Sequence, residues 1–420
     1  MNEKISWYLD FVDLNYEPKE TDIIAKFYVE PNENISIEEA AGRVASESSV
    51  GTWTTLSMLP NRVKELMAKV FEMNGNTIRV AYPIELWEPG NIPQLLSGVA
   101  GNIFGMKAVK NLRLLEIQLP QEYVKNFEGP KYGIDGIRKF MQIKDRPILA
   151  TVPKPKIGFD AEETAKVAYE ILSGGIDLLK DDENLTSLKF NKFKDRVDKV
   201  FKTIEKVEDE TGEKKSYLVN ITGPVDVMEK RAKLVSDYGG NYIMIDIITV
   251  GWSALQYMRK IAGDLHLAIH AHRAMHASFT RNKKHGITML VVAMLARLAG
   301  VDQIHTGAIV GKLEAEKGEV LNINRFLRSE WYQIKPIFPV SSGGLHPGLL
   351  PEVLTINDTV DLVIQVGGGV LGHPDGPRAG AKAVRDAIEA YLNDISLEEK
   401  AKVSRELKRA LERWGHLKPV

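Results

Sequence analysis

Apolar and polar positions alternate in a regular way along the C-terminal part of the chain. From about residue 146 onward, short apolar runs are followed by segments whose apolar residues recur at helical spacing, as in repeated strand–helix units on a parallel sheet. Eight units of this kind predict an α/β protein whose C-terminal domain closes into a (β/α)8 TIM barrel. The eight apolar runs are residues 147–152, 176–180, 216–222, 242–247, 265–272, 301–307, 337–344 and 360–369.

The segments between these runs carry helix signals. Asp160 and Glu163 have the spacing of a capping box, apolar residues follow at helical spacing, and Gly174 ends the predicted helix. A second apolar stripe, over residues 193–207, predicts a helix on the outside of the barrel. Residues 396–414 begin at a capping spacing and predict a polar-faced helix that closes the chain.

The N-terminal part of the chain follows a different pattern. Strand-like and helix-like segments are mixed there, which indicates a smaller α+β domain: residues 22–30 and 77–84 are strand-like, and residues 36–48 and 60–73 are helix-like. Gly and Pro gather at residues 126–133 and indicate a linker. We therefore expect domains at residues 1–129 and 130–420.

Composition narrows the possible partners. Lys and Arg number 55 and Asp and Glu 56, so no bulk charge attracts the chain to nucleic acid or to a membrane surface. The absence of cysteine excludes disulfides and thiolate metal sites. The first residues lack a signal-peptide pattern and no apolar run approaches the length of a membrane span, so we expect a cytoplasmic protein with neither nucleic acid nor membrane as partner.

Polar residues follow the predicted barrel strands at their carboxyl ends, where active sites of such barrels lie. Taken singly, each has a simpler explanation as a rim charge, a hydrogen-bonded structural histidine or a turn glycine. Together they converge on one face. They are Lys154 and Lys156 after the first strand; Lys180, Asp182 and Glu183 after the second; His270, His272 and Arg273 after the fifth; His305 and Lys312 after the sixth; Ser342, Gly343 and Gly344 after the seventh; and Gly367, Gly368 and Gly369 after the eighth.

The sequence Lys180-Asp181-Asp182-Glu183 places a lysine beside three acids. Lys180 and Asp182 point the same way on a strand, and Glu183 follows where the chain turns. Two carboxylates on one side suit a hard cation such as Mg²⁺, whereas a charged Lys180 would favour a simple salt-bridge cluster. Reaction of the neutral amine with CO2 would give a carbamate, a third carboxylate-like ligand, and so reconcile the lysine with a metal site.

Glycines at the ends of the last two strands offer backbone N–H groups, which is the usual form of a phosphate site in this fold. Arg273 and His305 could hold a second phosphate. Two anion sites on either side of one metal suggest a small bisphosphate substrate.

Several sequence blocks resemble, in order, those of the large chain of ribulose bisphosphate carboxylase/oxygenase (Rubisco). The resemblance covers nearly the whole chain and implies ribulose 1,5-bisphosphate, CO2 and O2 as substrates. The blocks are TDIIAKF, ESSVGTWTT, GNIFGMKA, KPK, GGIDLLKDDEN, HAHRAMHA, IHTGAIVGKLE, SSGGLHPG and GGGVLGHPDG.

The resemblance also implies roles in the barrel. Lys180 would be the carbamylated residue, with Asp182 and Glu183 as the other protein ligands of Mg²⁺ and Asp181 not a ligand. The carbamate would take the C3 proton to give an enediolate, and CO2 or O2 would then attack. Lys154 would deliver the final proton with the support of Lys156.

Substrate contacts follow from the same resemblance. Lys312, on a mobile loop, would close over the substrate, and His272 would act near the metal and the hydration step. Arg273 and His305 would bind one phosphate and Ser342 a substrate hydroxyl. The other substrate-binding positions are Gly343, Gly344, Gln365, Gly367 and Gly368 in the barrel, and Thr52 and Trp53 at the second phosphate.

The N-terminal residues are implied to act across a subunit boundary. Glu47 would pair with Lys312, and Asn102 would reach the metal-bound substrate. In the family these residues come from the neighbouring subunit, so a homodimer is the expected minimal unit, within a larger homo-oligomer.

Departures from the plant pattern indicate a subtype. Val152 stands where plant-type chains have a threonine, Pro153 follows it, and the chain ends early at ERWGHLKPV. Together with the lack of cysteine, these features resemble the archaeal, large-chain-only (form III) branch, which is linked to AMP and nucleoside salvage and needs no small subunit.

Two other functions compete with carboxylation. A Rubisco-like protein keeps the fold and metal site but performs enolisation or isomerisation, and it should lack parts of the carboxylation set. Here Lys312, Glu47, Asn102, His305 and Arg273 are all present. A phosphate-binding barrel without catalysis is a remote alternative, because it has no need of the KDDE cluster facing two lysines.

Overall fold

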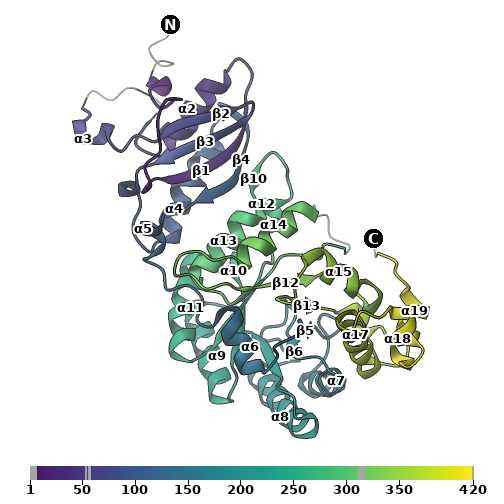
Figure 1. The fold of residues 1–420 in the computed structure, drawn as a ribbon. Coiled ribbons are helices and arrows are strands. Elements are labelled where there is room, and N and C mark those ends of the chain that lie inside the picture. Colours follow the sequence, from purple (N-terminus) through teal and green to yellow (C-terminus); the bar gives the residue numbers. More distant parts are fainter. Residues whose placement is uncertain (1–6, 53, 55–57, 311–316, 419–420) are drawn as a thin grey trace. The chain divides into compact units, whose positions relative to one another are not determined.

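The computed structural model describes residues 7–52, 54, 58–310 and 317–418 (Figure 1). Contacts divide these residues into two compact units. The first comprises residues up to Glu128 together with Met275–Leu298 and Tyr332–Ile334, and the second comprises Gly129–Ala274, Ala299–Trp331 and the chain from Lys335 onward. The domain limits at residues 129 and 130 stay a prediction, because these units are not continuous in sequence.

A mixed sheet forms the centre of the first unit. Its strand order is β10-β4-β1-β3-β2, and all neighbours are antiparallel except β10, which runs parallel to β4. Helix α2 (Ile37–Glu47) begins at Ser36, whose side chain accepts the Glu39 N–H and so caps the helix. The strands are β1 (Ile23–Pro31), β2 (Lys69–Asn74), β3 (Thr77–Tyr82), β4 (Val109–Gln118) and β10 (Gly286–Ile287).

The predicted helix at residues 60–73 is largely wrong. Only α3 (Asn61–Lys64) is helical, and the following residues form β2, which pairs with β3. A tight turn joins the two strands, and Gly75 in that turn has a φ of +56°, which other residues rarely adopt. Pairing with β3 buries Val70, so the hairpin outweighs the helix propensity of the segment.

Eight parallel strands close into a barrel in the second unit, as the sequence predicts. The order around the barrel is β11-β12-β13-β5-β6-β7-β8-β9, and each neighbouring pair is parallel. Every strand lies within one of the eight predicted apolar runs. The strands are β5 (Ile148–Thr151), β6 (Leu178–Lys180), β7 (Ser216–Asn220), β8 (Tyr242–Asp246), β9 (Ala268–His272), β11 (Gln303–His305), β12 (Phe338–Ser342) and β13 (Val363–Gln365).

Apolar side chains fill the barrel interior near the amino ends of the strands. Because inward-facing residues from successive strands meet there, this part of the interior is a packed core and not a pore. Its strand residues are Ile148, Ala150, Leu178, Leu218, Tyr242, Met244, Ala268, Phe338, Val340 and Val363.

Helices cover the outside of the barrel. Figure 1 shows α7 (Ala161–Ser173), α8 (Phe193–Thr211) and α17 (Pro377–Leu392) around it. Helix α7 has the predicted capping box between Asp160 and Glu163. Further helices of this layer are α9 (Val225–Asp237), α11 (Trp252–Asp264), α14 (Lys317–Arg328) and α15 (Leu350–Asn357).

The predicted closing helix at residues 396–414 is interrupted. It consists of α18 (Leu397–Ala401) and α19 (Arg405–Trp414), and Ser404 between them accepts the Leu407 N–H as a second cap. The Ser404 hydroxyl also donates to Asp386 of α17 at 2.5 Å, and this contact fixes the break.

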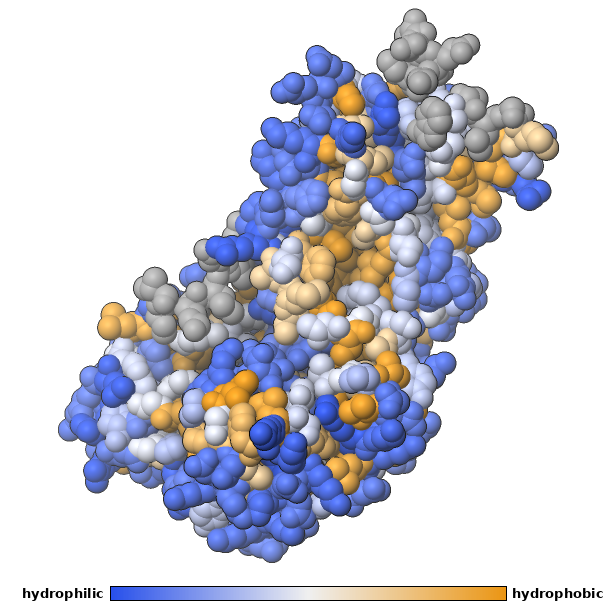
Figure 2. Space-filling view, turned by 180° about the vertical axis from the view of Figure 1, so that it is seen from behind, coloured by the Kyte–Doolittle hydropathy of each residue, from blue (hydrophilic) through white to orange (hydrophobic). Residues whose placement is uncertain are grey.

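Figure 2 shows one face, on which hydrophilic residues cover most of the surface and hydrophobic residues gather in areas between them. Among the described residues, no helix combines the length and apolar character that crossing a membrane requires.

Candidate active site

A layer of polar side chains follows the apolar core inside the barrel. Residues two positions apart on a strand face the same side, so a residue two positions after a core residue also faces the interior. Six strands continue in this way from an apolar core residue to a polar one, and the polar residues are Lys180, Asn220, Asp246, His270, Ser342 and Gln365. The candidate site therefore lies directly beyond the core, at the carboxyl ends of the strands.

Lys180 ends β6 and is almost completely buried, with 1% of its surface exposed. Burial lowers the pKa of this amine, although the charges of Glu183, Asp182, Asp246 and Asp181 oppose the shift. Its Nζ donates to the Asp181 carbonyl at 2.8 Å. A neutral amine is the form that can react with CO2, so the environment of Lys180 favours the chemistry expected of it.

The carboxylates of Asp182 and Glu183 each contact a lysine from the segment after β5. Lys154 Nζ lies 3.2 Å from Asp182 Oδ2, and Lys156 Nζ lies 3.0 Å from Glu183 Oε1. Burial would raise the pKa of Glu183, but backbone hydrogen bonding and the neighbouring charges lower it to about 2. Glu183 is therefore held as a carboxylate beside Lys156.

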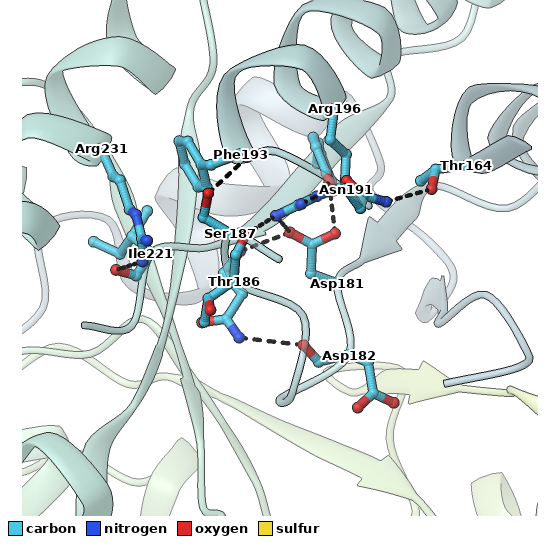
Figure 3. A network of polar contacts seen from close by, with 12 residues as sticks. Thr164, Asp181, Asp182, Thr186, Ser187, Asn191, Phe193, Arg196, Ile221 and Arg231 are labelled. Carbon is cyan, nitrogen blue, oxygen red and sulfur yellow. Dashed lines mark hydrogen bonds and ion pairs between the residues drawn. The ribbon is translucent and has the colours of Figure 1, made fainter. Parts of the chain in front are cut away.

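The Asp181 side chain belongs to a different environment. Its Oδ2 accepts from Arg196 at 3.2 Å and from the Asn220 backbone N–H at 3.0 Å, and its Oδ1 accepts from the Tyr217 hydroxyl at 2.5 Å. Figure 3 shows this network, in which Arg196 reaches Asp181 while the carboxylate of Asp182 points away from it. Asp181 is thus a structural residue, whereas its neighbour Asp182 faces the candidate site.

Asn220 holds the loop that carries the two site carboxylates. Its side-chain amide donates to the backbone carbonyls of Asp182 at 3.2 Å and of Glu183 at 3.0 Å. Arg196 donates to the Thr186 carbonyl at 2.8 Å, further along the same loop. These bonds satisfy buried polar groups and fix the direction of both carboxylates.

His272 connects Glu183 to Asp246. Its Nδ1 lies 2.9 Å from Asp246 Oδ1, and its Nε2 lies 3.7 Å from Glu183 Oε2. Burial lowers the pKa of His272, although the bond to Asp246 opposes the shift. A neutral ring that donates from Nδ1 to Asp246 keeps Nε2 as an acceptor facing the site.

Arg273 lies in a strongly desolvated position. Burial lowers its pKa to about 10, and Glu319 opposes this shift only through its charge. A terminal nitrogen of its guanidinium lies beside Gly307. A Cβ at this position would stand only 3.1 Å from that nitrogen, so the glycine leaves room for the guanidinium. An anion bound at this guanidinium would offset the cost of its burial.

His305, Ser342 and Gln365 lie together on three adjacent strands. His305 Nδ1 lies 2.8 Å from Ser342 Oγ, and Ser342 pairs in register with Gln365. The Gln365 side-chain oxygen is buried and has no hydrogen-bond partner among the described residues. A polar ligand in the site could satisfy it.

The predicted phosphate-site glycines follow β12 and β13. Gly343 and Gly344 have φ values of +115° and +70°, a region that side chains with a Cβ rarely adopt. A Cβ at Gly367 would stand 3.6 Å from the Lys154 side chain, which places this glycine beside the lysine. Around Gly368 a Cβ would meet nothing within 4 Å. Open backbone of this kind can approach an anion closely.

The described residues fit a metal only with the help of Lys180. They contain no group of three or more His, Asp or Glu side chains that could hold a metal ion. Asp182 and Glu183 supply two carboxylates, and a carbamate on the buried, weakly basic Lys180 would supply a third. Oxygen-only donors of this kind fit Mg²⁺.

The remaining predicted residues lie in the first unit or outside the described residues. Glu47 is the last residue of α2, Thr52 accepts from the Trp7 indole through its carbonyl at 3.2 Å, and Asn102 is exposed. Trp53 and Lys312 lie outside the described residues.

Several residues of the site are not among those predicted from the sequence. Asp246 and Asn220 end β8 and β7, so the rule that selects polar residues at the carboxyl ends of strands could have found them. No such signal marks Arg196, which comes from the outer helix α8. The hydroxyl of Thr151 donates to the Val366 carbonyl at 2.6 Å, so it does not replace the hydroxyl missing at Val152.

Comparison with known proteins agrees with this geometry. Residues 133–414 match the catalytic domain of the ribulose bisphosphate carboxylase large chain, and residues 10–123 match its N-terminal domain. A ribulose bisphosphate carboxylase of Pyrococcus abyssi is 62% identical over 420 residues, covering 99% of each chain.

Two solved structures are similar over nearly the whole chain. An octameric Rubisco of Pyrococcus horikoshii, in complex with sulfate, has a TM-score of 0.95 at 61% identity and 98% coverage of each chain. A dimeric archaeal Rubisco of Hyperthermus butylicus has a TM-score of 0.93 at 52% identity, covering 98% of this chain and 100% of that one. These three relatives are archaeal proteins. With both domains matched, the chain belongs to the ribulose bisphosphate carboxylase large chain family.

Proposed function

We propose that this protein carboxylates ribulose 1,5-bisphosphate with CO2 and water to give two molecules of 3-phosphoglycerate, with oxygenation by O2 as a competing reaction. The observation that carries the proposal is the position of Lys180, a buried amine with a lowered pKa beside Asp182 and Glu183. Such an amine accepts CO2 as a carbamate and completes a set of three oxygen donors. Neither a simple salt-bridge cluster nor a phosphate-binding barrel needs this arrangement.

Proton transfers are assigned to residues of the barrel. A carbamate on Lys180 would take the proton at C3 of the substrate, and C2 of the resulting enediolate would then attack the carbon of CO2. Lys154, whose contact with Asp182 at 3.2 Å supports this role, returns a proton to the product carbon, and Lys156 contacts Glu183 at 3.0 Å. His272, kept neutral by burial, offers Nε2 as the acceptor for a proton of the hydrating water.

Mg²⁺, held by the carbamate, Asp182 and Glu183, would supply the Lewis acidity that stabilises negative charge on the substrate oxygens. Arg273 and His305 bind one phosphate, and Ser342 binds a substrate hydroxyl. Gln365, whose buried side-chain oxygen lacks a partner among the described residues, adds a further substrate contact. Gly343, Gly344, Gly367 and Gly368 leave open backbone for the second phosphate.

Residues of the N-terminal domain complete the site from a second copy of the chain. Thr52 and Trp53 add to the second phosphate site, Asn102 reaches the reacting end of the substrate, and Glu47 pairs with Lys312. Lys312 is assigned to closure of the site over the substrate, which would exclude water while the enediolate exists. A homodimer is then the smallest active unit, as in the relative from Hyperthermus butylicus, whose structure is dimeric.

The substrate is proposed to come from AMP and nucleoside salvage, and the enzyme to act without a small subunit. The test of the activity is direct. Purified protein with Mg²⁺, ribulose 1,5-bisphosphate and labelled CO2 should place the label in 3-phosphoglycerate. Enolisation or isomerisation of the substrate with no label incorporated would overturn the proposal and favour the Rubisco-like alternative.

A further inference from the structure

Five polar side chains form a hydrogen-bonded chain through the inside of the barrel. It begins at Tyr242 in the apolar core, where the hydroxyl lies 2.9 Å from Gln303 Oε1. Gln303 Nε2 lies 2.8 Å from His270 Nδ1, and His270 Nε2 lies 3.0 Å from His305 Nε2. The chain ends in the site, where His305 Nδ1 lies 2.8 Å from Ser342 Oγ. Tyr242, Gln303 and His270 are fully buried.

The contacts allow only two arrangements of protons. A neutral imidazole has one N–H and one acceptor nitrogen. A ring that accepts a hydrogen bond at one nitrogen must therefore donate from the other, and a ring that donates from one nitrogen must accept at the other. In the forward arrangement, Gln303 donates to His270, His270 donates to His305, and His305 donates from Nδ1 toward Ser342. In the reverse arrangement the Gln303 amide is turned over and every one of these bonds points the other way. Burial lowers the pKa of both histidines well below the usual value, so both rings are neutral.

Tyr242 selects between the two arrangements. In the forward arrangement its hydroxyl donates to the Gln303 oxygen. In the reverse arrangement it accepts from the Gln303 amide, and its own proton needs another acceptor. Among the described residues, the Tyr242 hydroxyl has no partner except Gln303. A buried donor without a partner is unfavourable, so the forward arrangement is preferred.

Asp302 does not provide that other acceptor. Its charge acts on Tyr242, but its carboxylate accepts backbone N–H groups from Tyr132 at 2.7 Å, Gly133 at 2.9 Å and Ile269 at 2.9 Å. These bonds hold it at the amino end of the barrel, and no hydrogen bond joins it to the Tyr242 hydroxyl in the described part of the chain.

We propose that Tyr242 and Gln303 are positioning residues that fix the tautomers of His270 and His305, so that His305 Nδ1 donates to Ser342 and the Ser342 hydroxyl in turn faces the substrate as a hydrogen-bond donor. This inference rests on the proposed function, which assigns both groups to an anionic, hydroxylated substrate. With His305 donating to it, Ser342 keeps its own proton for a substrate oxygen. In the reverse arrangement the Ser342 hydroxyl would donate its proton to His305 Nδ1 and could not donate to the substrate. The lone pair of the unprotonated His305 Nδ1 would also repel an anionic oxygen.

The tautomers can be measured without reference to activity. In protein labelled with ¹⁵N in its histidine rings, ¹⁵N chemical shifts distinguish a protonated from an unprotonated ring nitrogen. His270→Asn and His305→Asn variants assign the two signals among the nine histidines. We expect His270 to carry its proton on Nε2 and His305 to carry its proton on Nδ1. A wild-type His305 protonated on Nε2 alone, or on both nitrogens, would overturn the inference.

Two variants test whether Tyr242 and Gln303 fix the tautomer of His305. Tyr242→Phe removes the donor that selects the direction, and Gln303→Met removes the link to His270 while keeping the side-chain length. Each should give a mixture of the two His305 tautomers. If the two become equally populated, KM for ribulose 1,5-bisphosphate should rise about twofold, because half of the protein has the binding-competent tautomer. The change in kcat should be smaller than the change in KM.

Tyr132→Phe is the matched control, because Tyr132 in the same unit donates its hydroxyl to the His266 carbonyl at 2.8 Å, outside the chain of five. It should leave both tautomers and KM unchanged. Unaltered His305 tautomers in folded Tyr242→Phe and Gln303→Met proteins would refute the assigned role. Correct tautomers in a protein that does not carboxylate would instead refute the proposed function and leave this inference standing.

Discussion

Arg196 of α8 lies 3.2 Å from Asp181 beside the candidate metal ligands, and both side chains are buried. The same guanidinium contacts the Tyr217 hydroxyl at 3.1 Å and Asn191 Oδ1 at 2.9 Å. An outer helix is thereby joined to the residue next to Asp182. This ion pair therefore contributes both to the packing of α8 on the barrel and to the position of the site carboxylates.

Loss of this ion pair should be costly. Arg196→Met keeps much of the side-chain volume but leaves Asp181 buried without its cation, so we expect about 3–5 kcal/mol less stability in urea unfolding. Lys202→Met is the control, since Lys202 pairs with Asp198 at 2.8 Å on the exposed face of the same helix. Because water screens this exposed pair, its loss should cost much less than the loss of the buried pair. Equal costs would contradict the importance given to the buried pair.

Lys180 should be indispensable for activation by CO2. In Lys180→Ala no other described side chain can supply a third oxygen beside Asp182 and Glu183, so both carboxylation and the slow CO2-dependent activation should disappear. The measurement is carboxylation after preincubation with and without CO2 and Mg²⁺. Retention of CO2-activated turnover would show that another residue carries the carbamate.

Lys312 should separate two steps of the reaction. Its proposed place on the closing loop, away from the metal ligands, predicts that Lys312→Ala still exchanges the C3 proton of the substrate with solvent. Carboxylated product should be almost absent, because the loop lysine is assigned to the later step. Exchange is followed by NMR in deuterated water and product formation by labelled CO2. An equal loss of both would contradict this division.

Glu47 and Lys180 should complement one another between subunits. Glu47→Gln and Lys180→Ala, each nearly inactive alone, are denatured, mixed and refolded together. In a mixed dimer with shared sites, one site carries both changes and the other carries neither. Random pairing makes about half of the dimers mixed, so roughly a quarter of wild-type activity should return. No recovery, with mixed dimers confirmed by mass, would mean that each site lies within one chain.

The contact between His416 and Glu398 should make a small contribution to stability that depends on pH. Nε2 of His416 lies 2.9 Å from Glu398 Oε1, and this bond raises the pKa of His416 above its usual 6.5. The stabilisation is therefore complete below pH 6.5 and is lost as pH rises through the raised value. Glu398→Gln should cost at most about 1 kcal/mol near pH 6 and almost nothing near pH 9.

Glu412→Gln provides the comparison for this effect. Glu412 pairs with Arg409 at 3.0 Å on the exposed side of α19, and arginine stays charged throughout this range. Its cost should be the same near pH 6 and near pH 9. A pH-independent cost for Glu398→Gln as well would show that the charge on His416 is not involved.

The sequence alone determined the architecture of the barrel, and it predicted the residues of the candidate site. Strand and helix periods are local properties, so apolar runs such as residues 176–180 and 242–247 could be read without knowing their partners. The rule that polar residues at carboxyl strand ends face the active site then identified Lys180, Asp182 and Glu183. In the structure β6 ends at Lys180, so all three residues lie at the carboxyl end of this strand, and their roles stay a prediction.

Local patterns failed where pairing or packing between distant segments decides the outcome. Residues 69–74 form β2 because β3 supplies a partner strand, and the closing helix breaks at Ser404 because Asp386 of α17 accepts its hydroxyl. Neither partner can be recognised from the segment itself.

The directions of buried side chains were also decided only by the tertiary structure. Asp181 and Asp182 are adjacent and chemically identical, yet Arg196, fifteen residues away, holds one, and Lys154 contacts the other. Likewise, Gln303 and Tyr242 are ordinary strand residues in the sequence, and only barrel closure brings them into line with His270 and His305. A buried polar group must find its partner wherever the fold provides one, and that choice is not written in the neighbouring residues.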